Sequence, residues 1–149
     1  MKSLFNEETL KEVLIRINNL QPTSERQWGK MEVDQMLAHC TEALKVACGE
    51  TFPPRIFIGR IVAPFIKSKY YDDSEIAKNI PTDKSFIIPE KKNFENEKAT
   101  LKKYAEMFCN NGQEKCTNHP HPFFGSLSPQ HWSIGMYKHL NHHLKQFGV

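Results

Sequence analysis

Apolar residues recur at spacings of three and four along four long stretches of the chain, which is the pattern of amphipathic α-helices. In the first stretch, residues 7–20, the apolar positions are Leu10, Val13, Leu14, Ile17 and Leu20. Acidic residues open this stretch and Pro22 follows it, as is typical of helix ends. A second stretch, residues 31–48, ends near Gly49 and predicts another helix.

The same pattern predicts two further helices in the second half of the chain. One begins at Phe94 and is stopped by the turn sequence Asn110-Asn111-Gly112. The other begins at Ser128-Pro129, an N-cap residue followed by proline at the first helical position, and runs to about Phe147. Residues 50–92 are divided by prolines, and they predict a short apolar helix across 55–67 followed by a polar, partly extended crossover.

Four amphipathic helices with one long crossover between the second and the third predict an all-α protein, a four-helix bundle. No stretch shows the period-two alternation of a β-strand. A length of 149 residues, 39% of them hydrophobic, suits a single domain over residues 1–149. Because short links join the first helix to the second and the third to the fourth, we expect each pair to be antiparallel neighbours.

Charge and cysteine content narrow the classes of function. Lys and Arg outnumber Asp and Glu by only 20 to 17, with the signs interleaved, so neither nucleic acid nor an anionic membrane is an expected partner. The N-terminus shows no signal-peptide pattern and no segment has transmembrane length, so we expect a soluble cytoplasmic protein.

The four cysteines form no C-x-x-C pair. Cys40 and Cys48 fall on an apolar helix face, so we expect them to be core residues.

Two histidines on the last predicted helix, His139 and His143, share its apolar face with Trp132, Met136, Leu140 and Phe147. Burying two basic rings is costly, and a metal ion removes that cost because side chains at i and i+4 reach one ion from the same face. His39 lies at the edge of the apolar face of the second predicted helix. His39 lies about 15 Å from the start of its helix, and His139 and His143 lie at a similar depth in theirs. The three histidines are therefore expected to meet near the middle of a bundle.

Three neutral imidazoles on one ion leave coordination positions open, as a catalytic site does. His142, about 60° from the centre of the face, is the reserve ligand. A structural alternative stays open, because a buried histidine is more often a hydrogen-bonded core residue than a ligand. Gln146 and Gln35 lie one turn from His143 and His39, and each is expected to orient an imidazole, to touch substrate, or to be an exposed polar residue.

The loop at residues 119–125 contains two histidines, two prolines and two phenylalanines. A rigid, aromatic loop of this kind suits the wall of a pocket above a metal. For Phe123 and Phe124 we prefer another interpretation, in which the two rings close the end of the bundle.

Four segments carry a resemblance to a known family: Trp28-Gly-Lys-Met31, Gln35-Met-Leu-Ala-His39, His121-Pro-Phe-Phe-Gly125 and the run from Tyr137 to Gly148. Together they resemble a domain family of unknown function within the DinB/YfiT-like superfamily, over nearly the whole chain. The resemblance implies a four-helix bundle with a three-histidine divalent metal site at His39, His139 and His143. It also implies a homodimer, and relatives similar to thiol S-transferases that use bacillithiol or mycothiol, or to mycothiol-linked isomerases.

Two classes of function follow. In the first, the protein is a metal-dependent transferase or hydrolase of a small molecule such as a low-molecular-weight thiol, using Zn, Ni, Mn or Fe to lower the pKa of a bound water or thiol. In the second, it is a metal- or ligand-binding bundle without turnover. No carboxylate is expected beside the histidines as a general base, so no catalytic residue is assigned.

Overall fold

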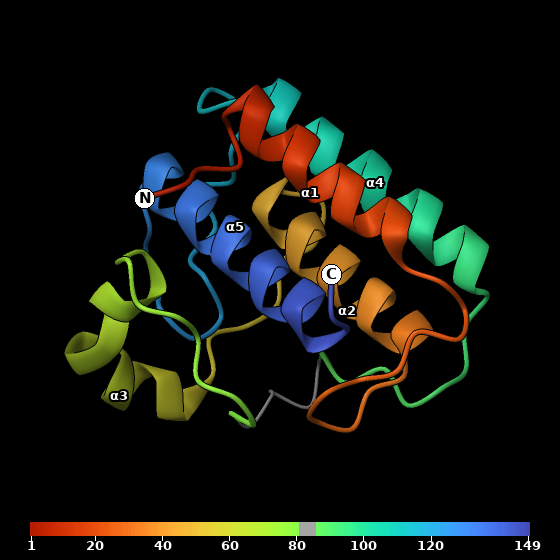
Figure 1. The fold of residues 1–149 in the computed structure, drawn as a ribbon. Helices are drawn as coiled ribbons and strands as arrows, with labels where there is room; N and C mark the ends of the chain where they lie inside the picture. Colours follow the sequence, from red (N-terminus) through yellow and green to blue (C-terminus); the bar gives the residue numbers. More distant parts are fainter. Residues whose placement is uncertain (81–85) are drawn as a thin grey trace.

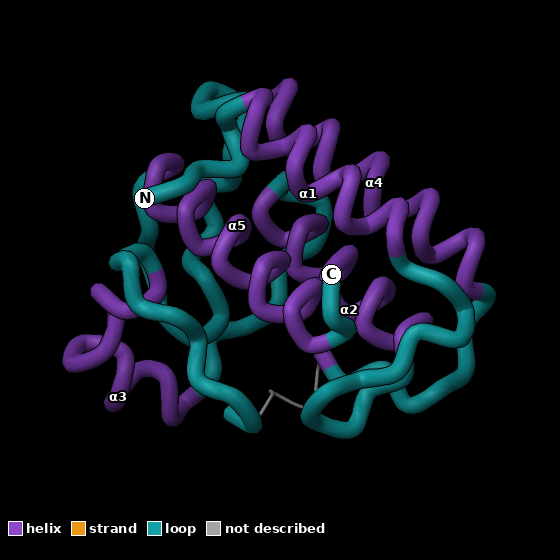
Figure 2. The backbone as a smooth tube through the Cα atoms, viewed as in Figure 1, coloured by secondary structure: helices purple, strands orange, loops and turns teal. Residues whose placement is uncertain are grey.

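The computed structural model describes residues 1–80 and 86–149, and within these ranges the protein is helical without a β-strand (Figures 1 and 2). Its helices are α1 (Glu7–Asn19), α2 (Val33–Ala47), α3 (Phe57–Ile66), α4 (Phe94–Asn111) and α5 (Pro129–Gln146), with a short 3-10 helix η1 (Lys67–Tyr70) after α3. The helices predicted from the periodicity are all present, with ends shifted by a few residues. Residues 81–85 of the predicted crossover lie outside the described residues.

Local capping explains where the long helices begin. The Asn6 side chain accepts a hydrogen bond from the Thr9 amide at 3.0 Å and opens α1. The Ser128 hydroxyl accepts from the His131 amide at 3.2 Å and opens α5, with Pro129 next in the chain as expected. These contacts satisfy amide groups that have no partner inside the helix, so the helix starts are set by nearby sequence.

The arrangement of the four long helices corrects one expectation. Helix α1 packs against α4 and α5, and α2 packs against the same two helices (Figure 1). Within the described residues, α1 and α2 are not neighbours and neither are α4 and α5, so the expected pairing of consecutive helices is wrong. The links at 20–32 and 112–128 are long enough to connect helices at opposite corners of the bundle. Each linking residue spans up to about 3.3 Å, whereas the axes of adjacent helices lie about 10 Å apart.

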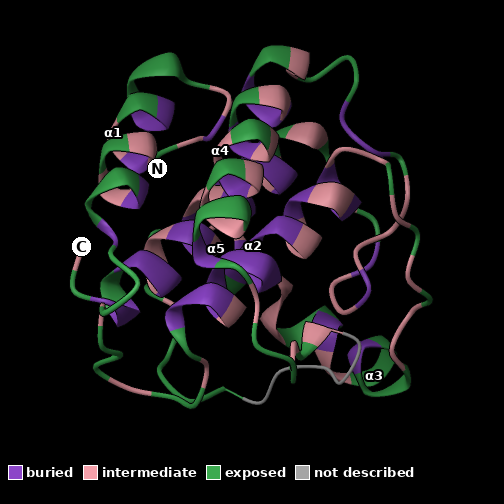
Figure 3. Cartoon of the chain, turned by 90° about the vertical axis from the view of Figure 1, so that its right-hand side faces the viewer, coloured by how far each residue is buried: buried purple, intermediate pink, exposed green. Residues whose placement is uncertain are grey.

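The core lies between these four helices. Figure 3 shows α1 and α4 alternating between buried and exposed bands, as amphipathic helices do. The largest fully buried side chains include Trp132, Phe108, Ile17, Leu37, Leu44, Leu101 and Leu140. Cys40 is only 1% exposed, so its expected place in the core is confirmed, whereas Cys48 is half-buried. None of the helices in the described ranges has both the length and the apolar run needed to cross a membrane.

Helix α3 lies apart from the four long helices (Figure 1). Its inner face is formed by Gly59 and Ala63, and a Cβ at Gly59 would stand 2.6 Å from the Phe123 carbonyl oxygen. The outer face exposes Phe57, Ile58, Ile61 and Phe65. Helix α3 therefore rests on the loop around Phe123, and Phe124 of that loop packs against the core in the role expected of a plug.

Gly135, in the middle of α5, allows η1 to pack against that helix. A Cβ at this position would lie 2.0 Å from Cε1 of Tyr70, a distance that real contacts do not reach. The ring of Tyr70 therefore occupies the space that any other residue at 135 would need for its side chain. Glycine in a helix interior lowers stability by about 1 kcal/mol relative to alanine. Here it lets the Tyr70 ring lie against α5 one helical turn before His139.

Candidate metal centre

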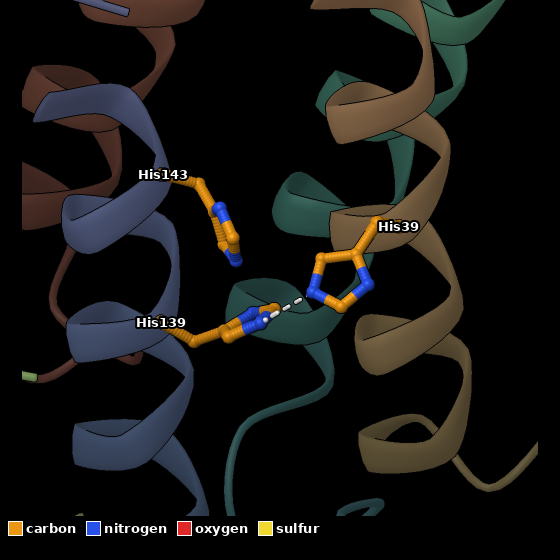
Figure 4. A group of neighbouring side chains, drawn as sticks. All are labelled: His39, His139 and His143. Atoms are coloured by element: carbon orange, nitrogen blue, oxygen red, sulfur yellow. Dashed lines mark hydrogen bonds between the residues drawn. The ribbon is translucent and has the colours of Figure 1, made fainter. Parts of the chain in front are cut away.

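Three histidines from two helices form one group. His39 extends from α2, and His139 and His143 extend from α5, into the space between the two helices (Figure 4). One ring nitrogen from each residue lies within 4.8 Å of those of the other two. The Nε2 atoms of His39 and His139 are 3.0 Å apart. The structure thus brings together the three residues that the sequence singled out.

The three histidines differ in how far they are buried. His39 and His143 are 5% and 7% exposed, whereas His139 is half-buried. The two most buried rings hold their positions by hydrogen bonds on the side away from the group.

The backbone carbonyl of Phe86 orients His39. The Nδ1 atom of His39 lies 2.9 Å from the Phe86 oxygen. Because a carbonyl oxygen only accepts, Nδ1 carries the proton and donates it. The lone pair of His39 is then on Nε2, the atom that faces the other two histidines.

An amide side chain performs the same task for His143. Its Nδ1 lies 2.9 Å from Oε1 of Gln146, while Nε2 of Gln146 donates to the Trp28 carbonyl oxygen at 2.7 Å. The Trp28 carbonyl fixes which way the amide points, so Gln146 presents its oxygen to His143 and accepts from Nδ1. The expectation that Gln146 orients an imidazole is confirmed. Gln35 does not do so, because its side chain accepts from the Glu32 amide at the start of α2.

The spacing of His39 and His139 fits two ligands of one ion. With the lone pair of His39 on Nε2, the 3.0 Å contact to Nε2 of His139 requires either a proton on His139 or a shared cation. Two nitrogens about 2.1 Å from one ion lie about 3.0 to 3.4 Å apart at ligand angles between about 90° and 109°. The third nitrogen, on His143, lies within 4.8 Å of both. The His39–His139 spacing therefore fits a divalent ion, and His143 lies near enough to become the third ligand after a small movement of its ring.

Burial keeps the three rings neutral. It is the main cause that lowers the pKa of His143 to about 3 and the pKa of His139 well below its ordinary value, and repulsion from the neighbouring histidines adds to both shifts. The pKa of His39 is also lowered by burial, and the hydrogen bond to Phe86 partly opposes that shift. Neutral imidazoles are the form that binds metals, so the lone pairs are available at neutral pH.

No acidic residue or cysteine joins this group in the part of the chain that the structure describes. Three neutral ligands would leave the charge of a divalent ion uncompensated by the protein. The same absence means that the group contains no carboxylate to act as a general base. The site can therefore attract an anionic ligand to an ion, but it offers no base of its own.

His142, the reserve ligand, lies outside the group. Its ring packs edge-on against Trp28, with the ring centroids 5.6 Å apart. It lines a separate cavity of about 730 Å³, together with residues such as Tyr137 and Lys138. His142 is therefore not placed as a substitute for any of the three histidines.

The sequence pattern missed the partners that orient the group. Phe86 and Trp28 contribute main-chain oxygens, and no residue type or spacing marks a carbonyl for this role. Tyr70 was missed as well, although the glycine at 135, within an otherwise regular helix, was a signal that another element approaches closely there.

The fold and the site together define an all-helical protein with a buried three-histidine group. The chain belongs to the DUF1569 family, described as a protein of unknown function, and the family model matches residues 2–148. No curated protein and no solved structure matches the chain significantly. The family assignment therefore covers nearly the whole chain and carries no activity with it.

Proposed function

We propose that this protein is a divalent-metal protein with His39, His139 and His143 as the ligands, on a DinB/YfiT-like four-helix bundle. The observation that carries the proposal is the orientation of the rings. The Phe86 carbonyl and the Gln146 amide oxygen hold the protons of His39 and His143 on Nδ1, so that both Nε2 lone pairs face one space. Metal-binding histidines are characteristically oriented by such partners on the second ring nitrogen.

The packing of α1, α2, α4 and α5 around one core supports the bundle part of the proposal. The two ligand-bearing helices α2 and α5 are neighbours, as a site between facing helices requires. Zn, Ni, Mn or Fe is the proposed ion. A homodimer in the cytoplasm, as the resemblance implies, belongs to the same proposal.

The reaction that we propose is transfer to or from a small molecule, or its hydrolysis, with a low-molecular-weight thiol as the substrate class. A divalent ion bound here would lower the pKa of a thiol or water that coordinates it, and so supply a nucleophile near neutral pH. Within the protein, His39 and His143 provide fixed neutral electron-pair donors, and the half-buried His139 completes the ligand set. The missing carboxylate is consistent with a thiol substrate, because a thiol bound as its thiolate needs no separate base.

A second candidate function is metal or ligand binding without turnover. The observation that favours it is the same composition of the group: in the described residues it offers no general base. The two candidates share the ligand set, and they differ in whether a metal-loaded protein consumes a thiol or hydrolyses a substrate.

Metal content of tag-free protein, measured by inductively coupled plasma mass spectrometry, tests the shared ligand set. The wild type is expected to retain near-stoichiometric metal, and a folded His139→Ala/His143→Ala variant is expected to lose it. His131→Ala is the matched control, because His131 is on the same helix but stacks on Tyr71 away from the group. Failure of the wild type to bind added Zn²⁺, Ni²⁺ or Mn²⁺ would overturn the proposal and favour histidines that serve the core.

A screen of the metal-loaded protein with thiol-transfer and hydrolase substrates then separates the two candidates. Turnover that disappears in the double variant and persists in His131→Ala supports an enzyme. Stoichiometric metal with no turnover supports the binding protein.

A further inference from the structure

Within the described residues, four buried side-chain donors have no hydrogen-bond partner, and they belong to Trp28, Arg55, Tyr70 and Trp132. Two of them, on Tyr70 and Trp132, are close together beside the first half of α5. The Tyr70 side chain is 7% exposed and the Trp132 side chain is 1% exposed. Among residues 1–80 and 86–149, neither the Tyr70 hydroxyl nor Nε1 of Trp132 finds an acceptor. Buried donors are ordinarily paired, so two of them in one place call for a ligand or a water that accepts from them.

Tyr70 lies close to the histidine group, and Trp132 lies about one turn further from it along α5. The ζ carbon of Tyr70, which carries the hydroxyl, lies 2.1 Å from the place of a Cβ on Gly135. Gly135 is four residues before His139 on α5, and Cβ positions with this spacing are about 6 Å apart on one helix face. Trp132 is three residues before Gly135, on the same face. The hydroxyl and the indole thus lie along the face of α5 that carries the histidines.

His121 joins these two residues into one cluster. Its ring centroid lies 5.0 Å from that of Tyr70 and 5.1 Å from that of Trp132. Its Nδ1 accepts from the amides of Phe123 and Phe124 at 3.1 and 3.2 Å, so the proton of the neutral ring is on Nε2. Tyr70, His121 and Trp132, here called the donor cluster, therefore present three donors, and the Tyr70 hydroxyl oxygen is the one free acceptor among them.

We infer that the donor cluster binds a carboxylate oxygen of the small molecule that the histidine group holds through its metal, with the Tyr70 hydroxyl as the principal donor. The inference rests on the proposed function and adds the chemistry of the substrate. A set of side chains in which donors predominate is complementary to an oxygen that only accepts. The substrate is then a thiol whose carboxylate lies about one helical turn from the sulfur.

The Tyr70→Phe variant removes only the hydroxyl and separates a ligand-binding role from a structural one. A hydroxyl that binds ligand and has no partner in the fold contributes nothing to stability, so the melting temperature is expected to stay the same or rise. Tyr104→Phe is the matched control, because the Tyr104 hydroxyl donates to Glu50 at the surface at 2.6 Å.

The binding experiment uses the Co²⁺-loaded protein and two thiols, mercaptopropionate and propanethiol, of which only the first carries a carboxylate. Absorption of the thiolate-to-cobalt band gives a dissociation constant for each. The wild type is expected to bind mercaptopropionate about tenfold or more tightly than propanethiol, as for a hydrogen bond to a charged group. Tyr70→Phe should lose most of this preference and bind propanethiol as before, and Tyr104→Phe should keep the preference. Trp132→Phe, which removes the indole donor, should reduce it.

The outcomes distinguish the two levels of the proposal. An unchanged preference in Tyr70→Phe would overturn the inference, while Co²⁺ uptake and propanethiol binding would still support the metal centre. A lower melting temperature together with an unchanged preference would show that water inside the fold satisfies the hydroxyl, which also overturns it. A wild type that takes up no Co²⁺ would overturn both the inference and the proposed function.

Discussion

The amide oxygen of Gln146 accepts the Nδ1 proton of His143 at 2.9 Å. Both side chains are buried, at 3% and 7% exposure, and they are three residues apart on α5. The contact determines which nitrogen of His143 keeps a lone pair for the histidine group. Gln146 is therefore a positioning residue, and its effect should be visible in metal affinity.

Gln146→Leu is expected to weaken metal affinity by about 10- to 100-fold, because the partner that fixes the tautomer and the ring orientation of His143 is lost. Competition with a chromophoric chelator measures the affinity. Gln130→Leu, at an exposed position in the first turn of α5, is the control and should bind as the wild type does. Equal affinity in both variants would contradict the positioning role.

Metal binding should stabilise the fold through the three ligands and not through His142. With Zn²⁺ at 100 times its dissociation constant, the free energy of unfolding is expected to rise by about 2.7 kcal/mol. His39→Ala should abolish this increase and His142→Ala should retain it, because His142 lies outside the group. Urea unfolding with and without Zn²⁺ provides the measurement, and loss of the increase in His142→Ala would place a fourth histidine at the site.

Gly135→Ala is expected to lower the free energy of unfolding by about 1 to 3 kcal/mol, because the new methyl group would overlap the Tyr70 ring. Without that overlap, alanine in a helix interior would raise stability by about 1 kcal/mol. The sign of the change in urea unfolding therefore reports whether Tyr70 packs on α5 as described.

The metal-free protein should lose stability in acid. Burial is the main cause that lowers the pKa of His121 and of His143 to about 3, while the unfolded chain binds the same protons near pH 6.5. Between these values the unfolded state holds more protons, so the free energy of unfolding rises with pH and falls as pH is lowered. The slope is up to about 1.4 kcal/mol per pH unit for each such histidine.

Urea unfolding of metal-stripped protein between neutral pH and about pH 4 measures this slope. His131→Ala is the control and should leave the slope unchanged, because the His131 ring stacks on Tyr71 and lies outside the two buried histidines that produce it. A stability that is flat over the range would contradict the burial of neutral histidines.

Much of the fold could be predicted because its signals are local. Asn6 and Ser128 cap amides only a few residues away, so the starts of α1 and α5 were readable from the sequence. The helical period likewise placed His139 and His143 on the face of Trp132 and Leu140. The neighbour relations of the helices were not predictable in this way, because links as long as 20–32 and 112–128 permit several arrangements of the same helices.

The sequence by itself determined which histidines face the interior, since side-chain direction in a helix follows from residue spacing alone. Only the tertiary structure decided what those histidines can do. It places the Phe86 and Trp28 carbonyls where they set the tautomers of His39 and, through Gln146, of His143. Such contacts join residues far apart in the chain through main-chain atoms that every residue has, so no pattern of side chains marks them.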